Sequence, residues 1–174
     1  MPFKVLGMSA SSMIAMDLDN DVVYYEYNAD QKRLIASITK IMTAIVTIEN
    51  VDINKEVTVG EEVLKAYGSA IYIKDLLYGL IMRSGNDAAV VLAKNVAGSM
   101  EGFANLMNEM ASKIGMSNSY FVNSHGLEEN DGSANESTAR DIVILTKYSM
   151  NNATFREIFG TKKHVAKSSQ KTYS

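Results

Sequence analysis

The sequence predicts one α+β domain, with its strands near the N-terminus and its helices after them. Between residues 12 and 27, two segments rich in Val, Ile, Met and Tyr flank the run Asp19-Asn20-Asp21. That run favours a tight turn, so we expect a β-hairpin. From residue 36 onward, apolar residues recur with the period of one helical face. The chain has 174 residues, of which 47% are hydrophobic, and this is enough for a single domain with an apolar core.

The first predicted helix covers residues 36–49 and begins near Ser37. Its apolar residues follow the spacing of one helical face: Ile41, Ala44, Ile45 and Ile48. Residues 57–59 are a candidate for a short extended segment. The apolar run at 75–82 is long enough only for a short buried helix.

Side chains and glycines typical of helix ends divide the rest of the chain into further helices. The candidate N-caps are Asn86 or Asp87, Ser99 and Ser137, and the glycines that end helices are Gly98 and Gly115. These signals predict helices at 88–96, at 99–114 and from 137 onward. The polar, turn-rich segment 128–137 is expected to be a surface loop.

Charge and composition exclude several classes of function. The net charge of -3 offers no basic surface for a polyanion, so we expect no nucleic-acid partner. The sequence has no Cys, which excludes thiolate metal sites and cysteine nucleophiles, and its two His leave little for a histidine metal site. It also has neither a run of about 18 apolar residues nor the pattern of a signal peptide.

Ser37 and Lys40 are the first candidates for catalysis. A spacing of three residues places the Ser hydroxyl and the Lys amine on one face of a helix, where the amine can accept the hydroxyl proton. The amine must then lose its charge near neutral pH, and we expect Ile38 and Ile41 to provide an apolar setting that lowers its pKa. The alternative is that Ser37 caps the helix and Lys40 extends into solvent, and the motif by itself favours this alternative.

Ser84 and Asn86 are the second pair of candidates. Two polar side chains two residues apart on a loop can both face a cleft, where Ser84 relays a proton and Asn86 binds a substrate carbonyl. The alternative is a plain loop in which Asn86 or Asp87 caps the next helix.

The chain resembles the serine-type D-alanyl-D-alanine carboxypeptidases, which are low-molecular-weight penicillin-binding proteins. Ser-x-x-Lys followed by a Ser-x-Asn triplet is typical of penicillin-recognising serine enzymes. Matching segments are spread over nearly the whole chain: Asn28–Asp30, Ala36–Ala44, Ser84–Val90, Leu92–Gly98, Gly115–Leu127 and Ser137–Asp141. Gly85 favours the carboxypeptidases over class A β-lactamases, which usually carry Asp at that position.

The resemblance implies a fold and a mechanism. The fold is an antiparallel sheet covered by a helical cluster, in a single domain over residues 1–174. Ser37 attacks the penultimate D-Ala carbonyl of a peptidoglycan stem peptide ending in D-Ala-D-Ala, and Lys40 accepts the proton. Ser84 passes a proton to the departing D-Ala, and Asn86 binds the peptide amide. β-Lactam antibiotics acylate the same serine, and no metal or cofactor takes part.

The sequence departs from the family at two places. It lacks the Lys-Thr-Gly triplet of a downstream strand, because Lys171-Thr172-Tyr173 has Tyr where Gly would be. The family also has a longer connection around residues 73 and 74. We therefore expect a domain that is incomplete at its C-terminus, a hairpin with an unpaired edge and an uncovered apolar face, weak catalysis and self-association.

Two other functions stay open at the level of sequence, a class A-like β-lactamase and a non-catalytic penicillin-recognising protein. The resemblance also implies export to the outer face of the cell membrane or the cell wall. Members of the family often anchor to the membrane through a C-terminal amphipathic segment, which is absent from these 174 residues.

Overall fold

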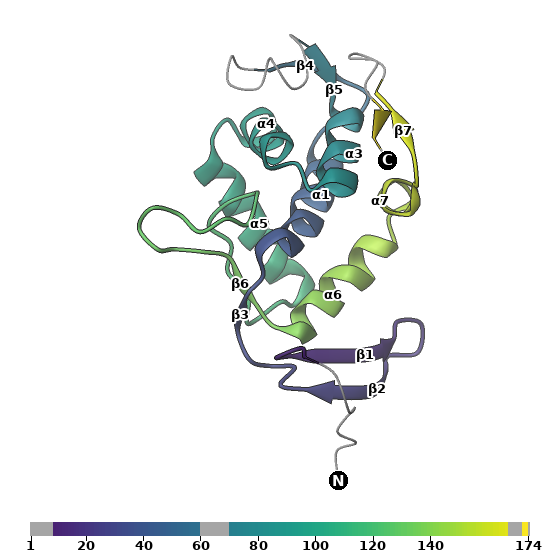
Figure 1. Ribbon diagram of the computed structural model, residues 1–174, viewed down its shortest axis with the longest axis vertical. Helices are drawn as coiled ribbons and strands as arrows, with labels where there is room; N and C mark the ends of the chain where they lie inside the picture. The colour runs from purple at the N-terminus through teal and green to yellow at the C-terminus, as the bar shows by residue number, and fades with distance from the viewer. Residues whose placement is uncertain (1–8, 60–69, 167–171, 174) are drawn as a thin grey trace.

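Helix α1 (Thr39–Asn50) lies in the middle of the molecule, and the other helices pack around it (Figure 1). The computed structural model describes residues 9–59, 70–166, 172 and 173. The surrounding helices are α3 (Ile73–Arg83), α4 (Asn86–Ala97), α5 (Met100–Ile114), α6 (Ala139–Met150) and α7 (Ala153–Gly160). The predicted helices are therefore confirmed, and α3 is longer than its apolar run.

The predicted N-terminal hairpin is confirmed. Strand β1 (Met13–Asp17) pairs antiparallel with β2 (Val22–Tyr27), and the register shifts between Ala15 and Met16. The Asp17 carboxylate accepts hydrogen bonds from the backbone N–H groups of Asp19 and Asn20, at 2.9 and 3.3 Å, and so stabilises the turn.

The remaining described strands form short antiparallel pairs. They are β3 (Arg33–Leu34) with β6 (Glu136–Ser137), β4 (Glu56–Thr58) with β5 (Ala70–Tyr72), and β7 (His164–Val165) with β8 (Thr172–Tyr173). The α+β class is confirmed. Over the described residues, however, the strands form separate two-stranded sheets in place of one sheet covered by helices. Lys171, the first residue of the triplet that imitates Lys-Thr-Gly, lies outside the described residues.

Basic side chains of α6 hold the hairpin against the helical body. The Arg140 guanidinium lies 2.8 Å from Glu26 and 2.7 Å from Asp30, and Lys147 pairs with Asp21. The hydrogen bond from Arg140 holds the pKa of Asp30 below its usual value.

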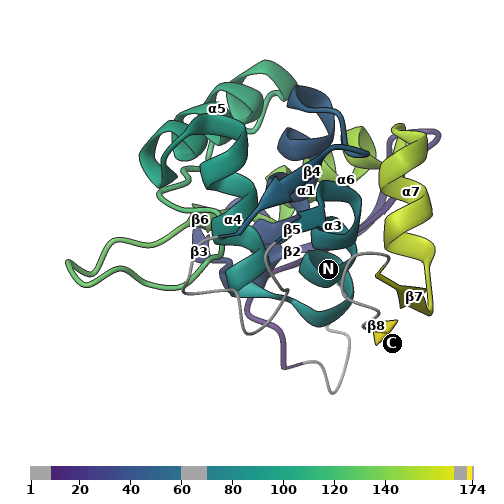
Figure 2. The ribbon, with the colours of Figure 1, turned by 90° about the horizontal axis from the view of Figure 1, so that it is seen from above.

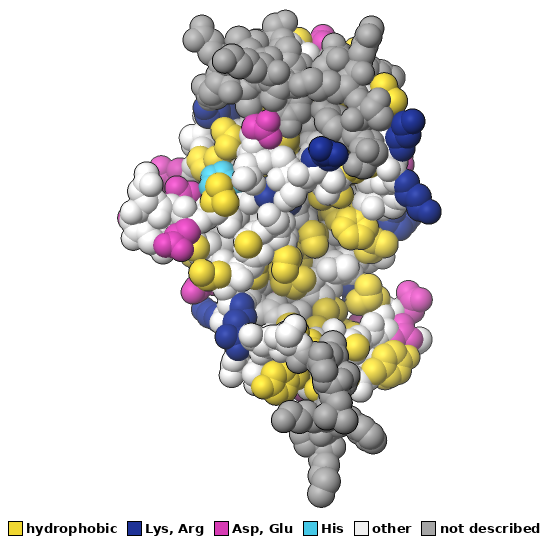
Figure 3. All heavy atoms as spheres, in the orientation of Figure 1, with side chains coloured by type: hydrophobic (Ala, Val, Ile, Leu, Met, Phe, Trp, Pro, Cys, Tyr) yellow, Lys and Arg dark blue, Asp and Glu magenta, His cyan; other side chains and the backbone are white. Residues whose placement is uncertain are grey.

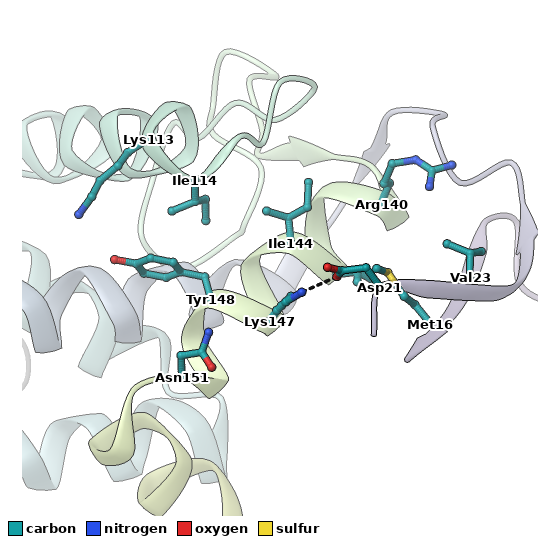
Figure 4. A pocket seen from close by; sticks show the side chains of 11 residues that line it. Met16, Asp21, Val23, Lys113, Ile114, Arg140, Ile144, Lys147, Tyr148 and Asn151 are labelled. Atoms are coloured by element: carbon teal, nitrogen blue, oxygen red, sulfur yellow. Dashed lines mark hydrogen bonds and ion pairs between the residues drawn. The ribbon is translucent and has the colours of Figure 1, made fainter. Parts of the chain in front are cut away.

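A groove of about 620 Å³ opens between the hairpin, α6 and the end of α5. Figure 4 shows side chains of all three elements around it, with the pair of Lys147 and Asp21 on one side. Exposed apolar side chains also gather on the hairpin (Figure 3), and Tyr24 is 70% exposed.

The side-chain caps at the starts of helices follow the sequence prediction at one helix and depart from it at two. The Ser99 hydroxyl accepts from the Gly102 N–H at 2.9 Å and caps α5 as predicted. The cap predicted at Ser137 was wrong, because Ser137 belongs to β6 and Thr138 caps α6. The side-chain cap predicted for α4 was also wrong. Only two residues join α3 to α4, so the latter is already helical at Asn86, after the N-cap Gly85.

The core lies between α1 and the helices around it. Its largest fully buried side chains come from most of these elements: Met42, Ile45, Leu76, Leu80, Leu92, Phe103, Met107, Phe121 and Phe155. In the part of the chain that the structure describes, no helix combines the length and the apolar character needed to cross a bilayer.

Loss of the α5 cap is a test of this local structure. Ser99→Ala leaves the Gly102 N–H without its side-chain acceptor, so we expect the free energy of unfolding to fall by about 1 kcal/mol in urea titrations. Ser112→Ala, on the exposed side of the same helix, is the control and should change stability by less than about 0.5 kcal/mol. Equal effects of the two substitutions would contradict the assignment of the cap.

Candidate active site

Ser37 lies on a single 3₁₀ turn, Ala36–Ile38, immediately before α1. Its side chain is exposed, and the preceding residue Ala36 has a φ of 43°, a left-handed conformation that alanine rarely adopts. The N-cap position of α1 is Ile38, with no side-chain capping bond. The alternative in which Ser37 merely caps the helix is therefore wrong.

Lys40 is buried beside Ser37, with only 3% of the residue exposed. Its Nζ lies 3.2 Å from the Ser37 Oγ and donates a hydrogen bond of 2.8 Å to the backbone carbonyl of His125. The alternative in which Lys40 extends into solvent is thus also wrong. Of the two isoleucines expected to provide an apolar setting, Ile38 is 46% exposed, whereas Ile41 is partly buried against the core.

Burial lowers the pKa of the Lys40 amine below its ordinary value, because desolvation disfavours the ammonium form. The acceptors around the amine are a hydroxyl and a backbone carbonyl, and neither carries a negative charge that would restore the pKa. The neutral amine, which can take a proton from Ser37, is therefore more populated here than on a solvated lysine.

The segment 123–127 supplies the wall against which Lys40 lies. It follows Phe121 and turns back toward α1, while the chain after it reaches out from the helical body as a long loop (Figure 2). Gly126 has a φ of +85°, and a Cβ there would lie 2.0 Å from the Ala36 carbonyl oxygen. The segment therefore contacts the backbone just before Ser37 as well as the Lys40 amine.

His125 contributes its backbone to the site, and its ring lies at the edge. The ring Nδ1 accepts from the Leu127 N–H at 3.1 Å, and Nε2 lies 3.8 Å from a Glu129 carboxylate oxygen. Desolvation lowers the pKa of His125, while Glu129 raises it and the Lys40 charge lowers it further. The imidazole is therefore neutral at pH 7. The hydrogen bond from the Leu127 N–H to the ring orders the turn.

Ser84 and Asn86 lie at the junction of α3 and α4, and both are exposed. Ser84 ends α3 with a left-handed φ of 53°, and Asn86 is the first residue of α4. Between them the Gly85 N–H donates to the Gly79 carbonyl at 3.2 Å, and a Cβ on Gly85 would lie 3.3 Å from that oxygen. The close contact between Gly85 and α3 thus fixes the turn that carries the side chains of Ser84 and Asn86.

Ser124 connects this junction to the helix of Ser37 and Lys40. Its carbonyl accepts from the Thr43 hydroxyl on α1 at 2.6 Å, and its own hydroxyl donates to the Ala89 carbonyl on α4 at 2.9 Å. One buried residue therefore connects α1 to the first turn of α4, the turn that begins at Asn86.

Two buried asparagines near the site were not predicted from the motifs. Asn135 was assigned to a polar surface loop, yet it is 1% exposed, and Asn123 is fully buried. Nothing in the local pattern distinguishes them from solvated turn residues. Asn123 bonds within its own turn, whereas Asn135 also bonds to Thr39, which lies far away in the sequence. Among the described residues, no cluster of three or more His, Asp or Glu side chains is arranged to hold a metal ion.

The helical body, the N-terminal hairpin and the Ser-x-x-Lys pair at the start of α1 agree with the family resemblance that the sequence predicts. A family model described as D-alanyl-D-alanine carboxypeptidase matches residues 3–174. The chain belongs to this family.

Relatives and solved structures agree with this assignment. The chain is 38% identical over 161 residues to the D-alanyl-D-alanine carboxypeptidase DacC of Escherichia coli, covering 81% of this chain and 39% of that protein. It is 32% identical over 182 residues to the D-alanyl-D-alanine carboxypeptidase of Streptomyces sp. strain K15, covering 92% and 61%. Penicillin-binding protein D2 from Listeria monocytogenes, in its ampicillin-bound form, has a TM-score of 0.86 at 26% identity, covering 97% and 73%.

The chain spans about two fifths of the length of the Escherichia coli and Bacillus subtilis relatives, 39% and 43% respectively. The match therefore concerns the part of those proteins that corresponds to the hairpin and the helical body.

The lowered pKa of Lys40 predicts how stability depends on pH. Between the folded pKa and the ordinary value of 10.5, the unfolded chain binds more protons than the folded one, so the free energy of unfolding rises with pH. Lys40→Met removes this contribution. The stability of the parent relative to this variant should therefore rise as the pH approaches 10.5 in urea titrations. The exposed Lys32→Met is the control, and a difference between parent and Lys40→Met that is independent of pH would contradict the prediction.

Gly126 offers a second test, with Gly132 as its matched control. Both have a positive φ, +85° and +83°, but only Gly126 faces a close atom, and nothing lies within 4 Å of a Cβ on Gly132. Gly132→Ala should cost about 1 kcal/mol for the left-handed backbone alone. Gly126→Ala should cost at least twice as much, because the Ala36 backbone must move. Similar losses of stability in thermal melts would show that the close approach is unimportant.

Proposed function

We propose that this protein is a serine D,D-carboxypeptidase that removes the terminal D-Ala from peptidoglycan stem peptides. The observation that carries the proposal is the buried amine of Lys40, 3.2 Å from the exposed hydroxyl of Ser37. A nucleophile and an uncharged base at hydrogen-bonding distance are what acyl transfer from a peptide requires. Membership of the D-alanyl-D-alanine carboxypeptidase family supports the substrate class.

The first half of the reaction forms an acyl-enzyme. The Ser37 Oγ bonds to the penultimate D-Ala carbonyl carbon while its proton moves to the Lys40 Nζ. A backbone N–H at the start of the helix contributes to stabilising the oxyanion. The peptide bond then breaks, and the terminal D-Ala nitrogen takes the proton that Lys40 received, relayed by Ser84. D-Ala leaves, and the Lys40 amine is neutral again. Asn86 holds the peptide amide of the acyl part during these steps.

The second half releases the shortened peptide. Water attacks the ester on Ser37 and gives a proton to the neutral Lys40 amine, and the serine oxygen leaves with a proton. A β-lactam follows the same first half, but its opened ring stays attached to the acyl group. The proposal therefore includes covalent inhibition by β-lactams, which agrees with the ampicillin-bound and cefotaxime-bound forms of the Listeria protein. The setting we propose is the cell wall, outside the cytoplasmic membrane.

The two alternative functions, a β-lactamase and a non-catalytic penicillin-recognising protein, differ from a carboxypeptidase in the steps that follow acylation. A β-lactamase hydrolyses its acyl-enzyme quickly, whereas a carboxypeptidase retains the penicilloyl group on the serine. A non-catalytic penicillin-recognising protein is labelled but releases no D-Ala. Gly85 between Ser84 and Asn86 favours the carboxypeptidase over the class A enzymes.

Labelling and product release test the proposal together. Incubation with a fluorescent penicillin should increase the mass of the protein by that of the intact drug, in a covalent adduct that is stable over minutes. Incubation with a D-Ala-D-Ala peptide should release free D-Ala. Ser37→Ala should abolish both, while Ser117→Ala, another exposed serine, should change neither. Labelling without release of D-Ala would favour the non-catalytic protein, and rapid loss of the label would favour a β-lactamase.

A further inference from the structure

The carbonyl that binds the Lys40 amine belongs to a segment without regular backbone pairing. Residues 121–128 form neither a helix nor a strand, so side chains must hold the His125 carbonyl in place. Two consecutive carbonyls of this segment face α1: the Ser124 carbonyl accepts from Thr43 and the His125 carbonyl accepts from Lys40. A small movement of the segment would therefore remove the amine's acceptor and admit water.

Asn123 closes the segment on itself. Its Oδ1 accepts from the Gly126 N–H at 2.7 Å, and its Nδ2 donates to the Leu127 carbonyl at 2.8 Å and to a Glu129 carboxylate oxygen at 2.6 Å. The turn around His125 thus has a fixed shape. Its position relative to α1 needs another residue.

Asn135 supplies that connection. Its Oδ1 accepts from the N–H groups of Val122 and Asn123, at 2.7 and 3.1 Å. Its Nδ2 donates to the Asn123 carbonyl and to the hydroxyl of Thr39, both at 2.9 Å. Thr39 directly precedes Lys40 on α1. One buried amide therefore joins the start of the segment to the first turn of the helix.

The backbone of Asn135 adds a second connection. Its carbonyl accepts from the Ile35 N–H at 3.2 Å, and Ile35 lies two residues before Ser37. The side chain must accept and donate at once, and only an amide has the two donors and the acceptor that these bonds use. An aspartate at this position could not donate, and an aliphatic residue would leave buried backbone groups without partners.

We propose that Asn135 is a positioning residue for the Lys40 amine, acting through segment 123–127 and Thr39. The residue touches neither Ser37 nor Lys40. It keeps the His125 carbonyl against the amine and keeps water away from it. The inference rests on the proposed role of Lys40 as the base, but it concerns the state of the amine in the free protein.

Few titratable groups lie near this amine among the described residues. The His125 ring and the Glu129 carboxylate face each other on the segment, and the Lys40 charge acts on the ring. Glu129 is held by the Asn123 amide at 2.6 Å. If the segment moves, hydration of the ammonium and any approach of Glu129 both favour the charged amine, so the pKa rises in either case.

The test measures the pKa of Lys40 directly, by following the Cε resonance of ¹³C-labelled lysine during a pH titration without substrate. Lys40→Met identifies the resonance. Asn135→Ala should raise the pKa by about one pH unit. Where the protein is acylated by penicillin, each such unit should slow acylation at neutral pH about tenfold.

Asn108→Ala is the matched control. This asparagine forms a similar pair of bonds with the backbone of the neighbouring Phe121, accepting from its N–H at 2.9 Å and donating to its carbonyl at 2.8 Å. Its loss should lower stability and leave the Lys40 titration unchanged. An unchanged titration in Asn135→Ala, or an equal shift in Asn108→Ala, would overturn the proposal.

Thr39→Val covers the case in which Asn135→Ala does not fold. It removes only the hydroxyl that accepts from the Asn135 amide and leaves the bonds within the segment intact. The expected result is a shift of the Lys40 pKa in the same direction and of smaller size, and no shift would overturn the proposal. Because the titration needs no turnover, failure of the proposed carboxypeptidase activity would leave these results readable.

Discussion

The burial of Lys40 is the constraint on which the rest of the site depends. An ammonium group taken out of water is costly unless it loses its proton or finds acceptors. Here its partners are the Ser37 hydroxyl and the His125 carbonyl, which bind the amine without the full charge that would keep it protonated. The fold thus gives up some stability and gains an amine that is less often protonated, beside an exposed hydroxyl. That exchange is the physical basis of the proposed chemistry.

The wall that buries the amine is built from loops, and this determines how the protein must stabilise it. Segment 123–127 has no ladder of backbone bonds, so buried side-chain amides satisfy its N–H and C=O groups. Asn123 shapes the turn, Asn135 ties it to α1, and Ser124 ties it to α4. A network of this kind is rigid when every member is satisfied and is vulnerable when one is removed.

Segment 123–127 also connects the two candidate pairs, Ser37 with Lys40 and Ser84 with Asn86. Gly126 has no side chain, which lets the loop contact the Ala36 carbonyl just before Ser37. Ser124 bonds to the first turn of α4, next to Asn86. The backbone next to Ser37 and the helix that carries Asn86 therefore contact the same segment. Displacing that segment would disturb both, although it carries no residue that the mechanism uses directly.

Local signals in the sequence predicted most of the elements. The Asx turn predicted the hairpin, the apolar period predicted α1 and α5, and the glycines predicted the helix ends at Gly98 and Gly115. Predictions failed where tertiary contacts compete with local preference. Ser137 looks like a cap, but its backbone pairs with β3, and Asn86 looks like a cap but follows a turn of only two residues. Motif spacing also found Ser37 and Lys40, because three residues bring side chains together on any helix.

The amino-acid sequence by itself determined the class of fold, the family and the identity of the candidate residues, because these follow from local periodicity and from short motifs. It did not determine whether Lys40 is buried. A lysine three residues after a serine is also compatible with solvent, and the motif taken by itself favoured that alternative. Only the tertiary structure decided the matter, because the groups that cover the amine come from residues more than eighty positions away. Desolvation depends on what lies around a group in space, and the spacing of residues along the chain does not contain that information.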